Sequence, residues 1–405
     1  MFEAFHEPDY RRFWLAQFIS NVGSWMQAVA QGWLVYRLTD SPFLLGFVGF
    51  ASSAPALILM LPGGVVADRF DRKRVVALSQ WAQAGCAFLL AVSIAAGRIT
   101  VWKIIAAAVV VGIAQSFSAP AFQAMLADLL EQRSRLPNAI AMNSLQFNLS
   151  RAIGPLMAGA TLTAWGSLWC FLLNSLSFLP LIRVLGSVKN RQQPMEGSTA
   201  MLRRLGEGLA FVRRDRVILL LLAVVAASSL FGYPFLNMMP VVARAMFTND
   251  AAGIGYLMAG AGGGALSGAL TLSMRTPEPR RALQYVAASL VVFGASLAAV
   301  GAFRSVAMVV ALLFVCGYMM VTGTALCNTS IQRRVPDALR GRVMSMYTFA
   351  FFAFIPFGNL AAGLMTERRG IAVALLWLGS GLAVSGIAVG AALLSSLRAA
   401  NRSTP

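Results

Sequence analysis

Long apolar stretches separated by short polar breaks run along the whole chain. A helix needs roughly 20 mostly apolar residues to cross a hydrocarbon core about 30 Å thick, and twelve stretches reach that length. They lie approximately at residues 13–36, 43–66, 75–97, 101–125, 138–165, 167–186, 217–243, 253–274, 282–303, 305–329, 343–366 and 371–396. The pattern predicts an all-α integral membrane protein with twelve transmembrane helices.

A polar stretch divides the predicted spans into two sets of six. Residues 187–216 are rich in arginine and contain several glycines. We expect them to form a cytoplasmic linker between an N-terminal six-helix bundle, residues 1–186, and a C-terminal six-helix bundle, residues 217–405. A domain boundary is expected at this kind of polar, glycine-containing segment.

The two halves show a weak internal repeat. Residues 154–159, GPLMAG, align with residues 358–363, GNLAAG, at an offset of 204 residues, and the same offset relates Gly64 to Gly268. Weak symmetry between halves is typical of transporter folds built from repeated bundles. The repeat therefore favours two related bundles and a transport function.

Composition and charge agree with a membrane location. The 405 residues are 58% hydrophobic and 12% charged, whereas soluble proteins are about 45–50% apolar and about 25% charged. The formal net charge of +18 would suggest a nucleic-acid partner in a soluble chain, but here the basic residues cluster between apolar stretches. Short loops rich in Lys and Arg stay in the cytoplasm. The clustering thus predicts that both termini are cytoplasmic, and it argues against nucleic-acid binding.

The inventory of reactive residues disfavours several classes of protein. The four cysteines lie inside apolar stretches without CxxC spacing, and His6 is the one histidine, so we expect neither a metal site nor a disulfide scaffold. No G-x-x-x-x-G-K-[ST] loop is present, which argues against ATP-driven pumping. Paired carboxylates and histidine clusters are also lacking within the spans, so an intramembrane enzyme is poorly supported.

Polar residues inside the predicted spans indicate an internal cavity. In the first span they recur at three- and four-residue spacing and share one helix face, and polar side chains in hydrocarbon usually face a bundle interior or water. Helix–helix hydrogen bonding is the alternative interpretation for each of them. The candidate cavity residues are Gln17, Asn21, Ser24, Gln27, Gln31, Gln115, Asn143, Gln146, Arg151, Tyr233, Asn237 and Asn328.

Arg151 is the most informative of these residues. It lies some 14 residues after the predicted start of its span, which is roughly 21 Å at 1.5 Å per residue and therefore near the midplane. A charge at that depth is costly unless it meets a substrate anion, water or backbone carbonyls. Arg151 is thus a candidate for binding an anion, or alternatively a packing residue bonded to carbonyls.

The segment between the second and third predicted spans carries a recognisable motif. Residues 64–74 read GVVADRFDRKR, which resembles the G-x-x-x-D-R-x-x-R-[RK] signature of the major facilitator superfamily, except that Asp71 stands where a glycine is usual. The resemblance implies gating and proton-coupling roles for a set of residues at the cytoplasmic side. This set is Gly64, Asp68, Arg69, Arg72, Lys73 and Asp128.

The size and charge of these residues suit them to gating and proton coupling. Gly64 would permit a close helix approach, Asp68 can meet the positive N-terminus of the eleventh span, and Asp128 is placed to pair with Arg72. Protonation of Asp68 or Asp128 would then release a latch between the bundles. The alternative is that the loop's arginines and lysine only fix topology.

A second motif lies in the fifth predicted span. Residues 150–159, SRAIGPLMAG, are similar to the antiporter motif G-x-x-x-G-P-x-x-G-G, with Ser150 and Ala158 in place of two glycines. The resemblance adds Gly154, Pro155 and Gly159 to the candidate gating residues. Residues 136–139 and 335–343 are similar to the exporter branch that includes the enterobactin and macrolide exporters, the transmembrane secretion effector family.

The resemblance implies a secondary exporter in the bacterial inner membrane. It would move amphipathic small molecules, of the drug or siderophore type, by alternating access and proton antiport, as a monomer in contact with membrane lipid and without a cofactor or ATP. Two alternatives stay open. One is an importer or facilitator of organic anions or sugars that uses Arg151; the other is a membrane scaffold or sensor that transports nothing.

Overall fold

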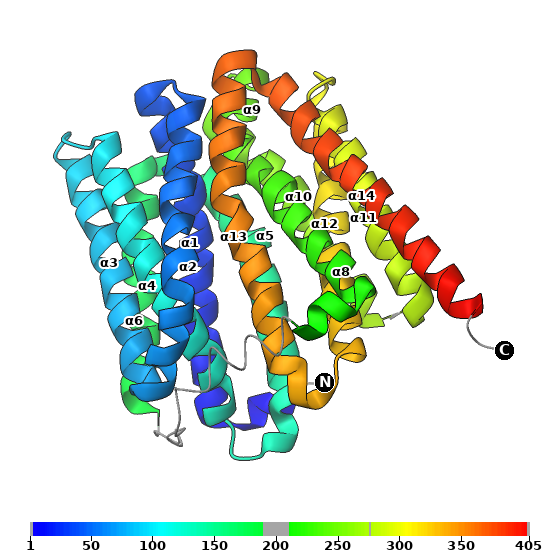
Figure 1. The fold of residues 1–405 in the computed structure, drawn as a ribbon. Helices are drawn as coiled ribbons and strands as arrows, with labels where there is room; N and C mark the ends of the chain where they lie inside the picture. The colour runs from blue at the N-terminus through cyan, green and yellow to red at the C-terminus, as the bar shows by residue number, and fades with distance from the viewer. Residues whose placement is uncertain (1–2, 189–209, 275–276, 403–405) are drawn as a thin grey trace. The chain divides into compact units, whose positions relative to one another are not determined.

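The computed structural model describes residues 3–188, 210–274 and 277–402, and these residues are almost entirely helical (Figure 1). Contacts within the chain divide it into two compact units. The first unit comprises Met1–Glu196 with Met239–Ala259, and the second comprises Gly197–Met238 with Gly260–Pro405. Most of the predicted linker, at 189–209, lies outside the described residues, so the predicted bundle boundaries stay predictions.

The first unit consists mainly of six long helices. They are α1 (Pro8–Thr39), α2 (Pro42–Arg69), α3 (Arg72–Ala95), α4 (Val101–Asp128), α5 (Leu136–Trp165) and α6 (Ser167–Ser187). Short 3-10 helices, η1 (Glu3–His6) and η2 (Arg133–Arg135), precede α1 and α5. The short helix α9 (Met239–Met246) and the first turns of α10 (Asp250–Met274) also group with this unit.

Local signals set the boundaries between these helices. Ser41 accepts a hydrogen bond from the backbone N–H of Leu44 at 3.2 Å, so it caps α2, and Asp71 caps α3 by accepting from the N–H of Lys73 at 2.9 Å. Side-chain oxygens at these positions satisfy the free N–H groups of a first helical turn. Gly166, with φ of 84°, joins α5 to α6, a conformation that glycine adopts without a Cβ penalty.

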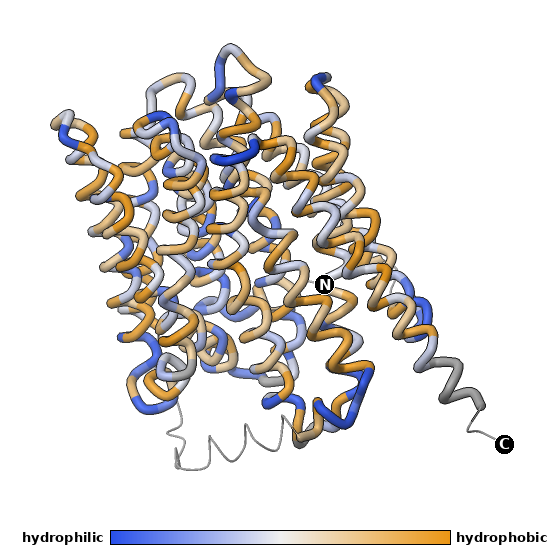
Figure 2. The backbone as a smooth tube through the Cα atoms, turned by 45° about the horizontal axis from the view of Figure 1, so that its top comes forward, coloured by the Kyte–Doolittle hydropathy of each residue, from blue (hydrophilic) through white to orange (hydrophobic). Residues whose placement is uncertain are grey.

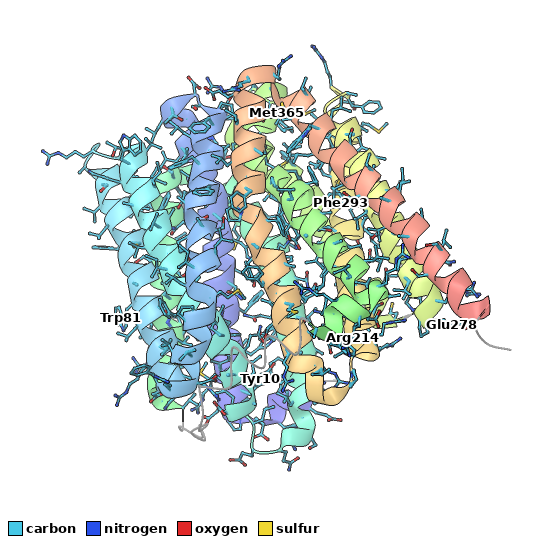
Figure 3. The ribbon with its side chains drawn as sticks, in the orientation of Figure 1. Tyr10, Trp81, Arg214, Glu278, Phe293 and Met365 are labelled. Carbon is cyan, nitrogen blue, oxygen red and sulfur yellow. The ribbon has the colours of Figure 1, made fainter. Side chains whose placement is uncertain are left out.

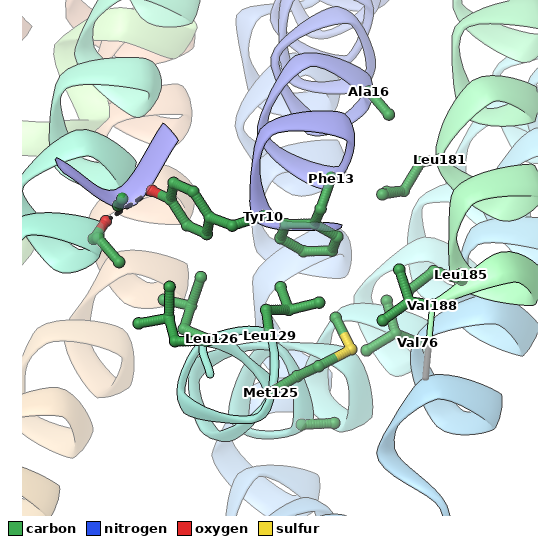
Figure 4. Close-up of a cluster of buried hydrophobic side chains, with 14 of the residues drawn as sticks. Tyr10, Phe13, Ala16, Val76, Met125, Leu126, Leu129, Leu181, Leu185 and Val188 are labelled. Carbon is green, nitrogen blue, oxygen red and sulfur yellow. Dashed lines mark hydrogen bonds between the residues drawn. The ribbon is translucent and has the colours of Figure 1, made fainter. Parts of the chain in front are cut away.

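A cluster of buried side chains lies at one end of the first unit (Figure 4). Tyr10 and Phe13 of α1 are at most 1% exposed and pack among residues of α4 and α6. The hydroxyl of Tyr10 donates to the carbonyl of Ala139 at 2.9 Å, and the indole N–H of Trp14 donates to the carbonyl of Met142 at 2.9 Å. These bonds align the first turns of α1 with those of α5.

The second unit contains four further long helices. Besides most of α10 they are α11 (Pro279–Val300), α12 (Val306–Arg334), α13 (Asp337–Arg369) and α14 (Ile371–Arg402). The α11 and α14 backbones approach closely, since a Cβ on Gly294 would lie 2.4 Å from the carbonyl oxygen of Gly379. Small residues allow such close helix contacts within membranes.

The seventh predicted span, residues 217–243, differs from a single α-helix. Helix α8 (Arg216–Ala227) is followed by a π-helical turn, η4 (Ser228–Gly232), a 3-10 turn, η5 (Tyr233–Met238), and then α9. Pro234 explains the break, because it has no N–H to donate to the carbonyl of Leu230 and its ring crowds that carbonyl. Irregular turns of this kind are frequent at functional sites.

Hydropathy supports a membrane location for both units. Figure 2 shows hydrophilic residues gathered at the helix ends and apolar residues along the helices. Among the described residues, ten helical segments are long and apolar enough to cross a membrane. Helices α1 and α5 are long but not among the ten, because polar residues along them lower their mean hydropathy. The described residues are all-α without strands, as predicted, whereas the count of twelve spans and the cytoplasmic termini stay predictions.

Candidate functional site

Arg72 occupies the centre of the motif between α2 and α3. Its Nη1 donates to Oδ2 of Asp128 at 2.9 Å, and its Nε donates to the carbonyl of Ala67 at 3.2 Å. Its Nη2 also lies 3.8 Å from Oδ1 of Asp68. The side chains of Arg72 and Asp128 are only 12% and 18% exposed. The pairing expected from the sequence is therefore present, and it joins the ends of α2, α3 and α4.

The other motif residues differ in exposure. The Asp68 side chain is 51% exposed, so solvent reaches it, and Arg69 is exposed as well. Lys73 instead donates from Nζ to the carbonyl of Val188 at 2.7 Å, which ties the start of α3 to the end of α6. Asp68 is thus the accessible carboxylate of the motif, while Asp128 is the enclosed one.

Of the two neighbouring glycines at the start of the motif, Gly63 is the one that makes a close helix approach. A Cβ on Gly63 would lie 2.3 Å from the carbonyl oxygen of Ser116 on α4, whereas a Cβ on Gly64 would meet no described atom within 4 Å. Gly64 was the candidate from the sequence, and Gly63 was missed. The motif pattern begins at Gly64 and does not record which helix face meets α4, so it does not include the glycine of this tight contact.

The polar residues of α1 form hydrogen bonds both within α1 and to the neighbouring helix α6. The Nε2 of Gln17 donates to Oδ1 of Asn21 at 2.9 Å, and Ser24 Oγ donates to the carbonyl of Ser20 at 2.9 Å. Gln27, in contrast, is 9% exposed and its Oε1 accepts from Nδ2 of Asn174 on α6 at 2.7 Å. Gln27 therefore links α1 to α6 by a hydrogen bond. Asn21, Ser24 and Gln31 are instead half-buried on α1.

Buried polar side chains also lie on α5, at Gln146, Ser150 and Arg151. Together with Gln17 of α1 they form a set that we call the polar level. Gln146 is 1% exposed, and neither atom of its amide has a hydrogen-bond partner among the described residues. Ser150 Oγ also lacks one, and Arg151 is 8% exposed. Because a buried polar atom without a partner costs about 1–3 kcal/mol, this level is suited to a polar ligand or ordered water.

Two contacts between α1 and α5 fix the height of this polar level. The Trp14 indole N–H bonds to the Met142 carbonyl at 2.9 Å. Three turns further along, a Cβ on Gly154 would lie 2.4 Å from Cβ of Trp25. Gln17 of α1, whose Oε1 also lacks a partner, lies between the two contacts, as does Gln146. The pair therefore shares one level of the α1–α5 interface.

The antiporter-like motif packs tightly on both of its sides. Besides the contact of Gly154 with Trp25, a Cβ on Gly159 would lie 2.7 Å from Cα of Gly255 on α10. Pro155 is buried, and Asn143, more than three turns earlier on α5, is half-buried. The predicted glycines thus mark helix approaches; their role in gating stays a prediction.

Sequence reasoning missed two buried amides on α3. Gln80 and Gln83 are 7% and 6% exposed, and Gln80 Oε1 has no partner among the described residues. The predicted cavity residue Gln115 of α4 is exposed and donates from Nε2 to Oε1 of Gln83 at 3.3 Å. The spacing of Gln80 and Gln83, three residues apart in an apolar helix, was the available signal.

In the second unit two of the predicted residues, Tyr233 and Asn237, lie in the irregular turn. The Tyr233 ring contacts the Phe351 ring edge-on, with centroids 4.9 Å apart, and Asn237 is half-buried in the same turn. Asn328 Oδ1 accepts from Nε2 of Gln332 on α12. Asn359 was missed as a candidate, although it is 3% exposed and its Oδ1 lacks a partner among the described residues. By the repeat offset Asn359 corresponds to Pro155.

Among the described residues, no group of three or more His, Cys, Asp or Glu side chains lies close enough to hold a metal ion. The four cysteines are free thiols. The polar groups on the facing parts of α1 and α5 are amides, hydroxyls and the Arg151 guanidinium, which bind and orient ligands by hydrogen bonding.

Comparisons with known proteins agree with the motifs. A family model described as transmembrane secretion effector matches residues 1–404. The chain is 24% identical over 365 residues to the staphyloferrin A transporter of Staphylococcus aureus, covering 89% of this chain and 90% of that one. It is 27% identical over 351 residues to the enterobactin exporter EntS of Shigella flexneri, covering 84% and 81%.

Solved structures share the fold at low identity. A bacterial homolog of the human lysosomal transporter Spinster matches with a TM-score of 0.77 and 13% identity, over 98% of this chain and 99% of that one. The nucleoside transporter NupG matches with a TM-score of 0.72 and 14% identity, over 95% and 99%. Both are transporters with the major facilitator fold.

These findings establish the class of the protein. Its relatives are transporters rather than enzymes, and ten apolar helices with bacterial exporter relatives make it a multi-pass protein of the bacterial inner membrane. The family model covers nearly the whole chain. The chain therefore belongs to the transmembrane secretion effector family of the major facilitator superfamily.

Proposed function

We propose that the protein exports amphipathic small molecules of the siderophore or drug type by alternating access. The observation that carries this proposal is the buried amide of Gln146, 1% exposed and without a partner for either polar atom among the described residues. A polar ligand entering this level would satisfy Gln146, Gln17 and Ser150 together. The names of the staphyloferrin A and enterobactin relatives support a siderophore-like cargo.

Aromatic side chains beside the polar level favour an amphipathic ligand. The rings of Trp25 on α1 and Phe147 on α5 meet edge-on with centroids 6.0 Å apart, and Phe147 is 47% exposed. Ligand sites combine apolar and aromatic walls with a few polar groups that fix orientation. Phe147 follows Gln146 directly, so a molecule with an apolar ring and polar edges suits this part of the helix.

Proton antiport is the proposed energy source, without ATP, and the proposed functional unit is a monomer. Within the described residues, no spanning helix offers a carboxylate near the polar level, so the coupling carboxylates in this proposal are those around Arg72. Asp68 is half exposed and Asp128 accepts from Arg72 at 2.9 Å. A proton arriving at either carboxylate removes one attraction from Arg72. The loosened junction of α2, α3 and α4 then permits the first unit to change its packing during the transport cycle.

Asp68→Asn is expected to abolish proton-coupled transport while leaving membrane insertion unchanged. The amide keeps the shape of the carboxylate but neither binds nor releases a proton at ordinary pH. The measurement uses liposomes with an imposed pH gradient and an internal pH dye, to which lipophilic drugs and catecholate siderophores are added one at a time. A substrate-dependent proton leak in the wild type that the variant lacks is the expected result.

Glu131→Gln is the matched control, because Glu131 is an exposed carboxylate just beyond the end of α4. It should retain the leak. Normal coupled transport by Asp68→Asn would refute the coupling role of Asp68. Transport that persists without any proton movement would refute antiport but leave export standing.

Arg151 supports a second candidate function, import or facilitated passage of organic anions or sugars. A guanidinium that is 8% exposed beside unpartnered polar atoms is suited to a carboxylate or phosphate group. If this candidate is correct, uptake of a labelled organic anion into liposomes should fall at least tenfold in Arg151→Gln. Uptake unaffected by this substitution would exclude anion recognition by Arg151, and failure to move any compound in either direction would favour a scaffold or sensor.

A further inference from the structure

Two neighbouring hollows in the second unit meet at Arg334. The first, with a volume of about 180 Å³, lies between the start of α11 and the end of α12. Pro279 and Leu283 give it an apolar wall, and Thr329 and Ser330 add hydroxyl groups. A water molecule takes about 30 Å³ in the liquid, so a phosphate group fits this hollow.

The second hollow is lined by arginines. It lies beside the start of α8 and the end of α14, with a volume of about 570 Å³, and Arg214, Arg216 and Arg334 line it together with Ser396. Arg334 lines both hollows, and Arg333 lines the first. Figure 3 labels Arg214 and Glu278 at the same end of the second unit.

The positive charge of these hollows is largely uncompensated. Asp215 is the one carboxylate that lines them within the described residues. Its Oδ2 accepts from Nε of Arg334 at 2.9 Å, and its Oδ1 caps α8. No carboxylate pairs with Arg214, Arg216 or Arg333 in the part of the chain that the structure describes.

The start of α11 borders the first hollow. Its N-cap residue Glu278 makes no side-chain cap bond, and the Glu278 carboxylate lies 4.0 Å from Nε of Arg281. Thr329 Oγ1 donates to the carbonyl of Ala325 at 2.9 Å. The Ser330 hydroxyl and several arginines therefore supply the donors that line a space with one apolar side.

We propose that this cationic pocket binds the phosphate group of an anionic phospholipid of the inner leaflet. The helix ends that form it carry the clustered arginines that the positive-inside rule assigns to the cytoplasm, which is where anionic headgroups concentrate. Basic pockets between transmembrane helices on that side are known lipid sites. The apolar wall at Pro279 and Leu283 accommodates the glycerol and the first acyl carbons, which free phosphate lacks.

The test measures binding of phosphatidylglycerol to the purified full-length protein in detergent micelles by native mass spectrometry. Phosphatidylcholine and inorganic phosphate serve as comparison ligands. Saturable binding of phosphatidylglycerol is expected, with an affinity that falls about tenfold in the double variant Arg214→Gln, Arg333→Gln, the order expected for removing two arginines at a lipid surface. The matched control removes two exposed arginines of α1, Arg11→Gln and Arg12→Gln, and should bind as the wild type does.

A second variant guards against misfolding of the double variant. Ser330→Asp places a carboxylate inside the first hollow without removing an arginine, and it should weaken phosphatidylglycerol binding as strongly. Equal loss in the α1 control would show diffuse attraction only and overturn the proposal. Inorganic phosphate competing at equal concentration would identify a free-anion site and also overturn it, as would unchanged binding in both pocket variants.

Discussion

Arg72→Ala is expected to lower the free energy of unfolding by about 3 kcal/mol and to abolish transport. Removing one partner of a mostly buried ion pair typically costs about 3–5 kcal/mol because the other charge is left uncompensated. Asp128 is 18% exposed, so the lower end of that range applies. The loss also frees the carbonyl of Ala67, and thermal unfolding in detergent followed by size exclusion measures the combined effect.

Arg74→Ala provides the matched control on the same helix turn. Arg74 is 85% exposed and lies 3.8 Å from Asp71, and an exposed pair contributes only about 0–1 kcal/mol. The two variants should therefore differ clearly in thermal stability. In the double variant Arg72→Ala, Asp128→Ala part of the loss should return, since no unpaired carboxylate remains. Equal effects of Arg72→Ala and Arg74→Ala would contradict a structural role for the Arg72–Asp128 pair.

Hydropathy and two motifs were enough to predict the all-α membrane fold and the superfamily. The length of an apolar stretch indicates directly whether it can span a bilayer. The pairing of Arg72 with Asp128 was predicted from their positions at neighbouring helix ends. The break after Ala227 was harder to predict. Pro234 signals a disturbed helix, but the choice between a kink and the observed π and 3-10 turns depends on packing, such as the approach of Gly358 to the carbonyl oxygen of Leu230.

The polar residues of the spans show where sequence reasoning ends. Gln27 and Gln146 are both glutamines in polar stripes, yet Gln27 bonds to Asn174 on α6 while both amide atoms of Gln146 lack partners among the described residues. Their difference lies in the neighbouring helix, which the spacing along one helix does not reveal. The bond of Gln83 was hidden for the same reason, because only the packing of α3 against α4 gives Gln83 a polar neighbour in Gln115.

Gly154 allows α1 and α5 to pack closely, about two turns beyond the polar level at Gln17 and Gln146. A Cβ at residue 154 would lie 2.4 Å from Cβ of Trp25 and 2.9 Å from the carbonyl oxygen of Val22. Neither atom is at the end of a flexible side chain, so the helices themselves would have to separate. The same separation would move Gln146 away from Gln17, about two turns earlier on each helix.

Gly154→Leu is therefore expected to destabilise the fold by about 3 kcal/mol, the upper part of the usual range for overpacking, and to abolish transport. Gly85→Leu is the matched control, because Gly85 is exposed on α3 and a Cβ there would meet no described atom within 4 Å. Leucine also favours a helix over glycine by up to about 1 kcal/mol, so the control should be as stable as the wild type or more stable. The apparent midpoint of thermal unfolding and the liposome assay report the two effects separately. Wild-type stability in Gly154→Leu would show that α1 and α5 can separate without cost, and the α1–α5 polar level would then lose its structural basis.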